Sequence, residues 1–262
     1  MESRRLPRSS SPRRSALLGC VASLTISACA LESPIIVLPP ALRDQSDVLP
    51  VSGRQGLLSW NRDIRFGPYR TTGTRVGWRG DDSTSWGVLD ANYTWDSNRP
   101  VSFALEAATC QRWRARCLGK AHRRRREKAV GLEASGHGLA IDRRVVEDTS
   151  AHGFECTLQP GDASAWQLVL SADNPSGFGG VLMDDRGSTV ARIRATDRQT
   201  GRPYTYSVPS PVGFIIEASS ADVAAVERAF DGKVILARST PPTQRCALAT
   251  VAAALLLWEP LR

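Results

Sequence analysis

The chain contains little of the material from which metal and redox sites are built. It has two methionines and three histidines in 262 residues, and no Cys-x-x-Cys pair. Zinc ribbons and thioredoxin-like redox motifs need that cysteine spacing, so the sequence favours neither. No stretch reaches 18 uninterrupted apolar residues, which argues against a polytopic helical membrane protein. The 42% hydrophobic and 23% charged content is that of an ordinary globular protein.

Residues that could carry catalysis are also scarce. The three histidines are spaced 15 apart, which matches no compact metal motif, and we interpret them as solvated loop residues: His122, His137 and His152. No Gly-x-Ser-x-Gly elbow is present, and we interpret the paired acids as turn residues: Asp81-Asp82 and Asp184-Asp185. The sequence therefore predicts no catalytic residue, no metal site, no cofactor and no enzymatic activity.

The N-terminus has the layout of a secretory signal peptide. A basic leader precedes an apolar or small stretch at residues 16–28, and its arginines are Arg4, Arg5, Arg8, Arg13 and Arg14. The following Ile26-Ser27-Ala28-Cys29 resembles the lipobox of bacterial lipoproteins. That resemblance implies removal of residues 1–28, acylation of Cys29 and, because the next residue is Ala30 and not aspartate, anchoring in the outer membrane. A second, poorer lipobox ends at Cys20, and an ordinary cleaved signal peptide is the alternative.

Positive charge is concentrated in one segment. Removing residues 1–28 lowers the formal net charge from +8 to about +4, whereas Arg112 to Lys128 holds nine basic residues and one acid. The densest part is the run Arg123, Arg124, Arg125 and Arg126. We favour the interpretation of residues 119–148 as a solvated, disordered insertion between strands. The functional alternative is that these four arginines contact an anionic surface, either lipid headgroups or lipopolysaccharide. Nucleic acid is not an expected partner, because export removes the protein from the cytosol.

The rest of the chain divides into a tether and one domain. Scattered prolines at residues 29–55 favour an extended, flexible, lipid-anchored tether. From residue 56 to 262 we predict a single β-rich domain. Alternating apolar residues at 154–158 and 166–170 predict a hairpin, and segments 181–183 and 190–195 predict another. Further strands are predicted at 204–208, 213–217, 223–230 and 234–237, although 223–230 also fits a helical stripe.

The C-terminal segment differs from everything before it. Residues 246–258 contain a single polar side chain, Thr250, and thirteen helical residues are too short to cross a bilayer. A helix that is apolar on all sides must be buried, so we predict a core helix at residues 243–258.

About a dozen short strands followed by one apolar helix resemble the tubby-like barrel of tubby proteins, phospholipid scramblases and LURP-one-related proteins. The segments that carry the resemblance are the hairpins within 181–195 and 214–238, together with 246–258. It implies an all-β, mainly antiparallel, closed barrel of about twelve strands around a buried C-terminal helix. A β-sandwich with a docked C-terminal helix is the alternative.

Four cysteines follow Cys29, and three disulfide connectivities are possible among them. We favour Cys117–Cys156, because both lie in strand-like segments flanking the basic insertion. Cys246, on the apolar helix, is compatible with an unpaired core thiol. The leading functional hypothesis is a non-catalytic cell-envelope lipoprotein that binds or scaffolds at the membrane surface. A secreted hydrolase with scattered active-site residues is the alternative.

Overall fold

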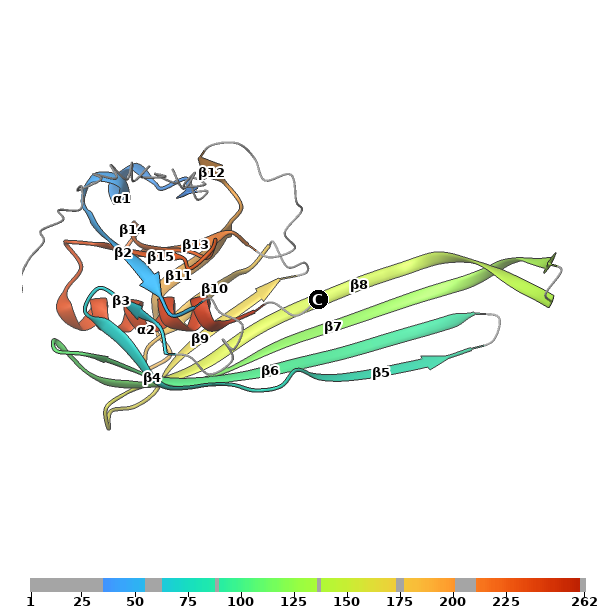
Figure 1. Cartoon of the computed structure of the whole chain (residues 1–262), viewed down its shortest axis with the longest axis horizontal. Coiled ribbons are helices and arrows are strands. Elements are labelled where there is room, and N and C mark those ends of the chain that lie inside the picture. Colours follow the sequence, from blue (N-terminus) through green and yellow to red (C-terminus); the bar gives the residue numbers. More distant parts are fainter. Residues whose placement is uncertain are drawn as a thin grey trace, which may run out of the picture. The chain divides into compact units, whose positions relative to one another are not determined.

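The computed structural model describes residues 35–54, 63–87, 90–135, 138–172, 177–200 and 211–259, and for residues 35, 132–135, 138–140 and 199–200 it describes the backbone alone. Antiparallel strands dominate, and two helices accompany them (Figure 1). The strands are β1 (Ile35–Ile36), β2 (Ser46–Ser52), β3 (Arg65–Phe66), β4 (Tyr69–Val76), β5 (Gly80–Trp86), β6 (Ala91–Ala107), β7 (Cys110–Ser135), β8 (Gly138–Pro160), β9 (Trp166–Ala172), β10 (Gly179–Met183), β11 (Thr189–Thr196), β12 (Gln199–Thr200), β13 (Gly213–Ala218), β14 (Ala221–Glu227) and β15 (Lys233–Ala237). The helices are α1 (Pro40–Asp44) and α2 (Pro242–Leu257).

The main sheet closes on itself. Its strand order is β4-β3-β2-β15-β14-β13-β11-β10-β9-β8-β7-β6-β5, and β4 also pairs with β6. In that pairing Thr71 lies opposite Leu105, and Val76 lies opposite Val101. Twelve strands therefore form a closed barrel, and β5 is one extra strand on β6. The predicted closed barrel is confirmed. The sandwich alternative is wrong, because two separate sheets would leave β4 and β6 unpaired with each other.

The helix α2 fills the barrel. Every residue from Cys246 to Leu256 is buried. The side chain of Thr250 is also buried, and its hydroxyl donates to the carbonyl oxygen of Cys246 at 2.8 Å. This bond satisfies the one polar side chain in the segment, so burial on all sides costs little. The prediction of a core helix at 243–258 is confirmed.

Aromatic packing fixes the end of α2 against the barrel wall. The Trp258 ring stacks on Phe154, with centroids 4.7 Å apart, and Phe178 meets it edge-on at 4.5 Å. Gly119 on β7 makes this approach possible, because a Cβ there would lie 3.0 Å from Trp258 Nε1. The absence of a side chain at residue 119 therefore determines how closely Trp258 packs against β7.

Two arginines bind the last carbonyls of α2. Arg54 Nε donates to the Leu256 carbonyl at 3.0 Å, and Arg228 Nη2 donates to the Trp258 carbonyl. Helix C-terminal carbonyls lack intrahelical partners and carry partial negative charge, so cations are favourable there. Arg228 is itself buried, and desolvation lowers its pKa to about 9.

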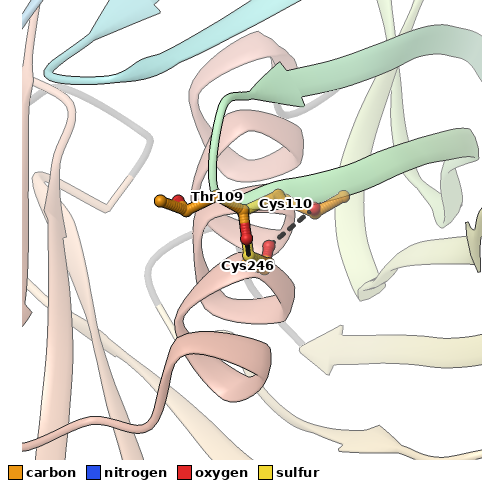
Figure 2. Close-up of a disulfide and its surroundings, with 4 residues drawn as sticks. Thr109, Cys110 and Cys246 are labelled. Atoms are coloured by element: carbon orange, nitrogen blue, oxygen red, sulfur yellow. Dashed lines mark hydrogen bonds between the residues drawn. A yellow bond between two sulfur atoms is a disulfide. The ribbon is translucent and has the colours of Figure 1, made fainter.

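A disulfide joins α2 to the barrel wall. Cys246 is bonded to Cys110 at the start of β7, with the Thr109 carbonyl beside it (Figure 2). The interpretation of Cys246 as an unpaired thiol is therefore wrong. The two cysteines are 136 residues apart, and closure of the barrel around α2 is what brings them together. The second disulfide, Cys117–Cys156, is the pair favoured from the sequence, and it joins directly paired residues of β7 and β8.

The predicted tether is wrong from residue 35 onward. Strand β2 pairs with β15 and β3 within the barrel, and β1 pairs with β12 in a separate two-stranded sheet. Leu42 of α1 and Ile36 are buried, and they pack with residues of β13, β14 and β15: Ile215, Ala225, Ile235 and Ala237. These strands are covered by α2 on one face and by the N-terminal segment on the other. A proline-containing sequence is ordered here because it buries apolar side chains.

Two hairpins predicted from the sequence are present in the barrel. The hairpin of 154–158 with 166–170 is confirmed, with Phe154 opposite Leu170, and so is that of 181–183 with 190–195. Residues 221–227 form a strand and not a helix. In the sequence Asp231-Gly232 favours a two-residue hairpin turn before β15, but the connection is longer, because Glu227 pairs with Lys233. The strand predicted at 204–208 lies outside the described residues.

Candidate functional sites on the four-stranded extension

Four strands continue past the barrel as a smaller sheet, which we call the extension. It comprises β5 with the outer parts of β6, β7 and β8: residues 80–86, 91–99, 119–135 and 138–151. Barrel neighbours stop earlier, since β4 pairs with β6 from residue 101 onward and β9 pairs with β8 from residue 152 onward. Figure 1 shows the four strands side by side. Residues 119–135 and 138–148 therefore belong to strands, and the interpretation as a disordered insertion is wrong.

The two faces of the extension continue the two faces of the barrel wall. Along β7, buried Trp113, Ala115 and Cys117 alternate with exposed Arg114 and Arg116. Side chains alternate across a strand, and directly paired residues share a face. The face that continues the buried residues, here the inner face, carries Ala121, Arg123 and Arg125. The opposite, outer face carries Lys120, His122, Arg124 and Arg126.

Strand alternation thus divides the arginine run between two surfaces. On the inner face, Arg123 donates to both carboxylate oxygens of Asp148, from Nε at 2.9 Å and Nη2 at 2.6 Å. These hydrogen bonds lower the pKa of Asp148 and raise the pKa of Arg123. Arg125 forms an ion pair with Glu127 at 2.6 Å. The inner-face arginines are therefore neutralised within the protein.

The outer face has unbalanced positive charge at its end distant from the barrel. Near the barrel, Lys120 pairs with Glu155 at 3.0 Å and His122 pairs with Asp96 at 2.8 Å. Farther out, four cations form no ion pair within the described part of the chain: Arg124, Arg126, Lys128 and Arg144. Glu147, opposite Arg126, is the one acid directly paired with them. Of the four arginines named for an anionic-surface contact, Arg124 and Arg126 therefore form no ion pair among the described residues, whereas Arg123 and Arg125 have carboxylate partners. The contact itself stays a prediction.

A large aromatic side chain accompanies these cations. Trp86 at the end of β5 is paired with Asn92, which is paired in turn with Arg126, so Trp86 lies on the outer face. Its exposed fraction is 67%. Indole rings combine an apolar body with one polar N–H and are favoured at lipid–water interfaces. Exposed tryptophan beside unpaired arginine is thus suited to a phosphate-bearing surface.

The inner face is hollowed into a groove of about 880 Å³. Residues from all four strands line it, among them Asp81, Trp95, Ser97, Arg123, Asp148 and His152. Asp81 accepts hydrogen bonds from Ser97 Oγ and from Arg79 Nε, the latter at 2.6 Å. Both lower the pKa of Asp81, that from Ser97 more strongly. The groove therefore holds its carboxylates ionised and fixed in position.

Histidine and acidic residues differ in part from their sequence interpretation. His152 is buried in β8, so its interpretation as a solvated loop residue is wrong; His122 is exposed but lies in β7. His137 lies outside the described residues. Asp81 and Asp82 belong to β5 and not to a turn, whereas Asp184 does accept turn hydrogen bonds from Arg186 and Ser188. Among the described residues, no three His, Cys, Asp or Glu side chains are arranged to hold a metal ion.

Sequence reasoning missed the groove, because its residues come from segments up to about 70 positions apart. One local signal was available. Asp148, Ser150 and His152 occur at every second position, and such spacing places three polar side chains on one face of a strand.

The lipidation candidate Cys29 lies outside the described residues. Within them, no helix is long and apolar enough to cross a membrane. No protein-family model matches the sequence, and no curated protein or solved structure matches the chain. The resemblance to the tubby-like barrel therefore stays a prediction.

Proposed function

We propose that the protein is a non-catalytic, lipid-anchored protein of the bacterial cell envelope whose extension binds the phosphate groups of an anionic surface through its outer face. The observation that carries the proposal is the set of unpaired cations beside Trp86: Arg124, Arg126, Lys128 and Arg144. Unpaired surface cations are attracted to phosphate, and each contributes about 1 kcal/mol near an anionic leaflet. The source of the phosphate is either phospholipid or lipopolysaccharide.

Two further features support this function. Two disulfides suit an oxidising compartment outside the cytosol, as the export signal predicts. A lipid on Cys29 would hold the barrel close to the membrane. A second, weak attachment through the outer face would then act at high effective concentration.

Vesicle binding tests the proposal. The exported chain carrying Cys29→Ser, which removes the acylation site, is titrated with phosphatidylcholine vesicles containing phosphatidylglycerol and, separately, with lipopolysaccharide. Arg124→Gln/Arg126→Gln should weaken binding by about thirtyfold, because two cations contribute about 2 kcal/mol. If the variant loses binding to only one of the two surfaces, the vesicles or the lipopolysaccharide, that surface is the source of the phosphate.

The matched control is Arg123→Gln/Arg125→Gln, which removes the same charge from the same strand on the opposite face. This variant should retain most of the binding, since both arginines already have carboxylate partners. Equal loss in the two variants would show that net charge alone attracts the surface, and it would contradict the assignment to the outer face.

A further inference from the structure

The inner-face groove has the properties of a ligand site, and the proposed phosphate contact does not use it. Its volume of about 880 Å³ lies within the range of small-molecule sites. Two rows of directly paired residues form its centre. Asp81, Ser97, Ala121 and His152 make one row, and Ser83, Trp95, Arg123 and Ser150 make the next. Four strands spaced about 4.8 Å apart give the rows a span of about 14 Å, the length of a short oligomer and not of a single small ion.

Four charged residues that line the groove form two ion pairs. Arg79 binds Asp81, and Arg123 binds Asp148 through two parallel hydrogen bonds. A carboxylate has about four acceptor positions, so both aspartates keep lone pairs for a ligand after binding their arginines. The groove therefore presents fixed acceptors and donors without a net charge on these four residues.

An aromatic surface lies beside these polar groups. Trp95 stacks with Tyr93, with centroids 5.5 Å apart and an interplanar angle of 13°. The guanidinium of Arg123 lies 5.7 Å from the centre of the Trp95 ring. Both neighbours contact the indole, which still exposes 37% of its surface. Such a pre-ordered aromatic side chain offers apolar contact without losing side-chain freedom on binding.

His152 supplies an independent indication of a ligand. Its side chain is 9% exposed and lines the groove, with Phe178 edge-on behind it at 6.1 Å. Its Nδ1 is buried and has no hydrogen-bond partner in the described part of the chain. Buried polar atoms are nearly always satisfied, and exceptions call for an explanation. A ligand hydroxyl or a bound water that reaches Nδ1 would supply the missing hydrogen bond of this ring.

We propose that the inner-face groove binds a neutral saccharide, with Trp95 contacting the ring face and Asp81, Asp148 and His152 bonding its hydroxyls. Sugars present an apolar C–H face and hydroxyls that both donate and accept, which matches an indole surrounded by fixed donors and acceptors. Two carboxylates would repel an anion. Each carboxylate already binds an arginine, which disfavours a cation, and a wholly apolar ligand would desolvate the charged side chains of the lining without replacing their hydrogen bonds to water.

The test uses the exported chain with Cys29→Ser on an array of immobilised neutral oligosaccharides of glucose, galactose, mannose and N-acetylglucosamine. Affinity for each retained oligosaccharide is then measured by isothermal titration. Trp95→Ala and Asp148→Asn are the groove variants. Trp86→Ala is the matched control, because Trp86 is an exposed tryptophan on the outer face of the same sheet. Thermal unfolding of every variant shows that the barrel is intact.

The expected result is retention of at least one neutral oligosaccharide and a loss of about tenfold or more in affinity for each groove variant. Trp86→Ala and Arg124→Gln/Arg126→Gln should leave that affinity unchanged. An array without any retained oligosaccharide overturns the proposal, and so does equal affinity in Trp95→Ala. Because vesicle binding depends on the outer face, either proposal can fail while the other stands.

Discussion

His152 shows how the surroundings of one residue determine its chemistry. In the sequence it follows alanine and precedes glycine, which resembles a loop. In the structure it belongs to β8, where it borders both the groove and the aromatic cluster around Trp258. Burial disfavours the imidazolium and lowers the pKa of His152. The folded protein therefore holds this ring neutral at pH values where the unfolded chain takes up a proton.

This difference predicts an acid-dependent loss of stability. As the pH falls below about 6.5, the unfolded chain takes up a proton at His152 more readily than the folded protein does. The free energy of unfolding should therefore fall with pH in this range, and His152→Gln should reduce the slope of stability against pH. Urea unfolding at pH 7.5 and 5.0 measures this slope. An unchanged slope in His152→Gln would contradict the prediction.

Among the elements, α2 depends most on covalent attachment. Strands β7 and β8 are hydrogen-bonded along their whole shared length, so the Cys117–Cys156 bond joins segments that are already paired. The helix has no such ladder. Packing, the two arginines at its C-terminus and the Cys110–Cys246 bond hold it inside the barrel.

The two disulfides should therefore contribute unequally to stability. In the loop-closure description, Cys110→Ala/Cys246→Ala removes a cross-link over 136 residues and costs about 5 kcal/mol of unfolding free energy. Cys117→Ala/Cys156→Ala removes one over 39 residues and costs about 4 kcal/mol. Urea unfolding of both variants at one pH shows which of them loses more unfolding free energy. A larger loss for the shorter cross-link would show that α2 is held by packing and not by its disulfide.

For the whole molecule, a single mass measurement tests export, lipid anchoring and disulfide formation together. The protein taken from washed membranes should have the mass of residues 29–262 plus acyl chains, because the lipobox places cleavage before Cys29. Reduction should add the mass of four hydrogens, two for each disulfide. Intact-mass spectrometry with and without reduction measures both. A soluble form that begins at another residue would contradict the anchor, and an unchanged mass on reduction would contradict the disulfides.

Most of the fold could be predicted because its signals are local. Alternation within 154–158 and 166–170 defines a hairpin without reference to the rest of the chain, and the apolar run at 246–258 requires burial wherever it lies. Barrel closure had no such signal. It depends on the pairing of β4 with β6 and on β2, which lies in the proline-containing segment that favoured a tether in the sequence. Burial of Ile36 and Leu42 against the outer side of the barrel overrides that local preference.

The candidate sites also combine features that local sequence predicts with features that only folding decides. The sequence by itself determined the composition of the basic run and the apolar helix, since each follows from neighbouring residues or from chemical type. It also predicted an export signal and favoured Cys117–Cys156 among three possible connectivities. Only the tertiary structure decided which arginines are neutralised, where Cys246 is bonded and that a groove exists. The physical reason is that strand alternation turns Arg123 toward Asp148 and Arg124 away from it. The partners that neutralise, bond or enclose a residue here come from other strands, and only folding brings them together.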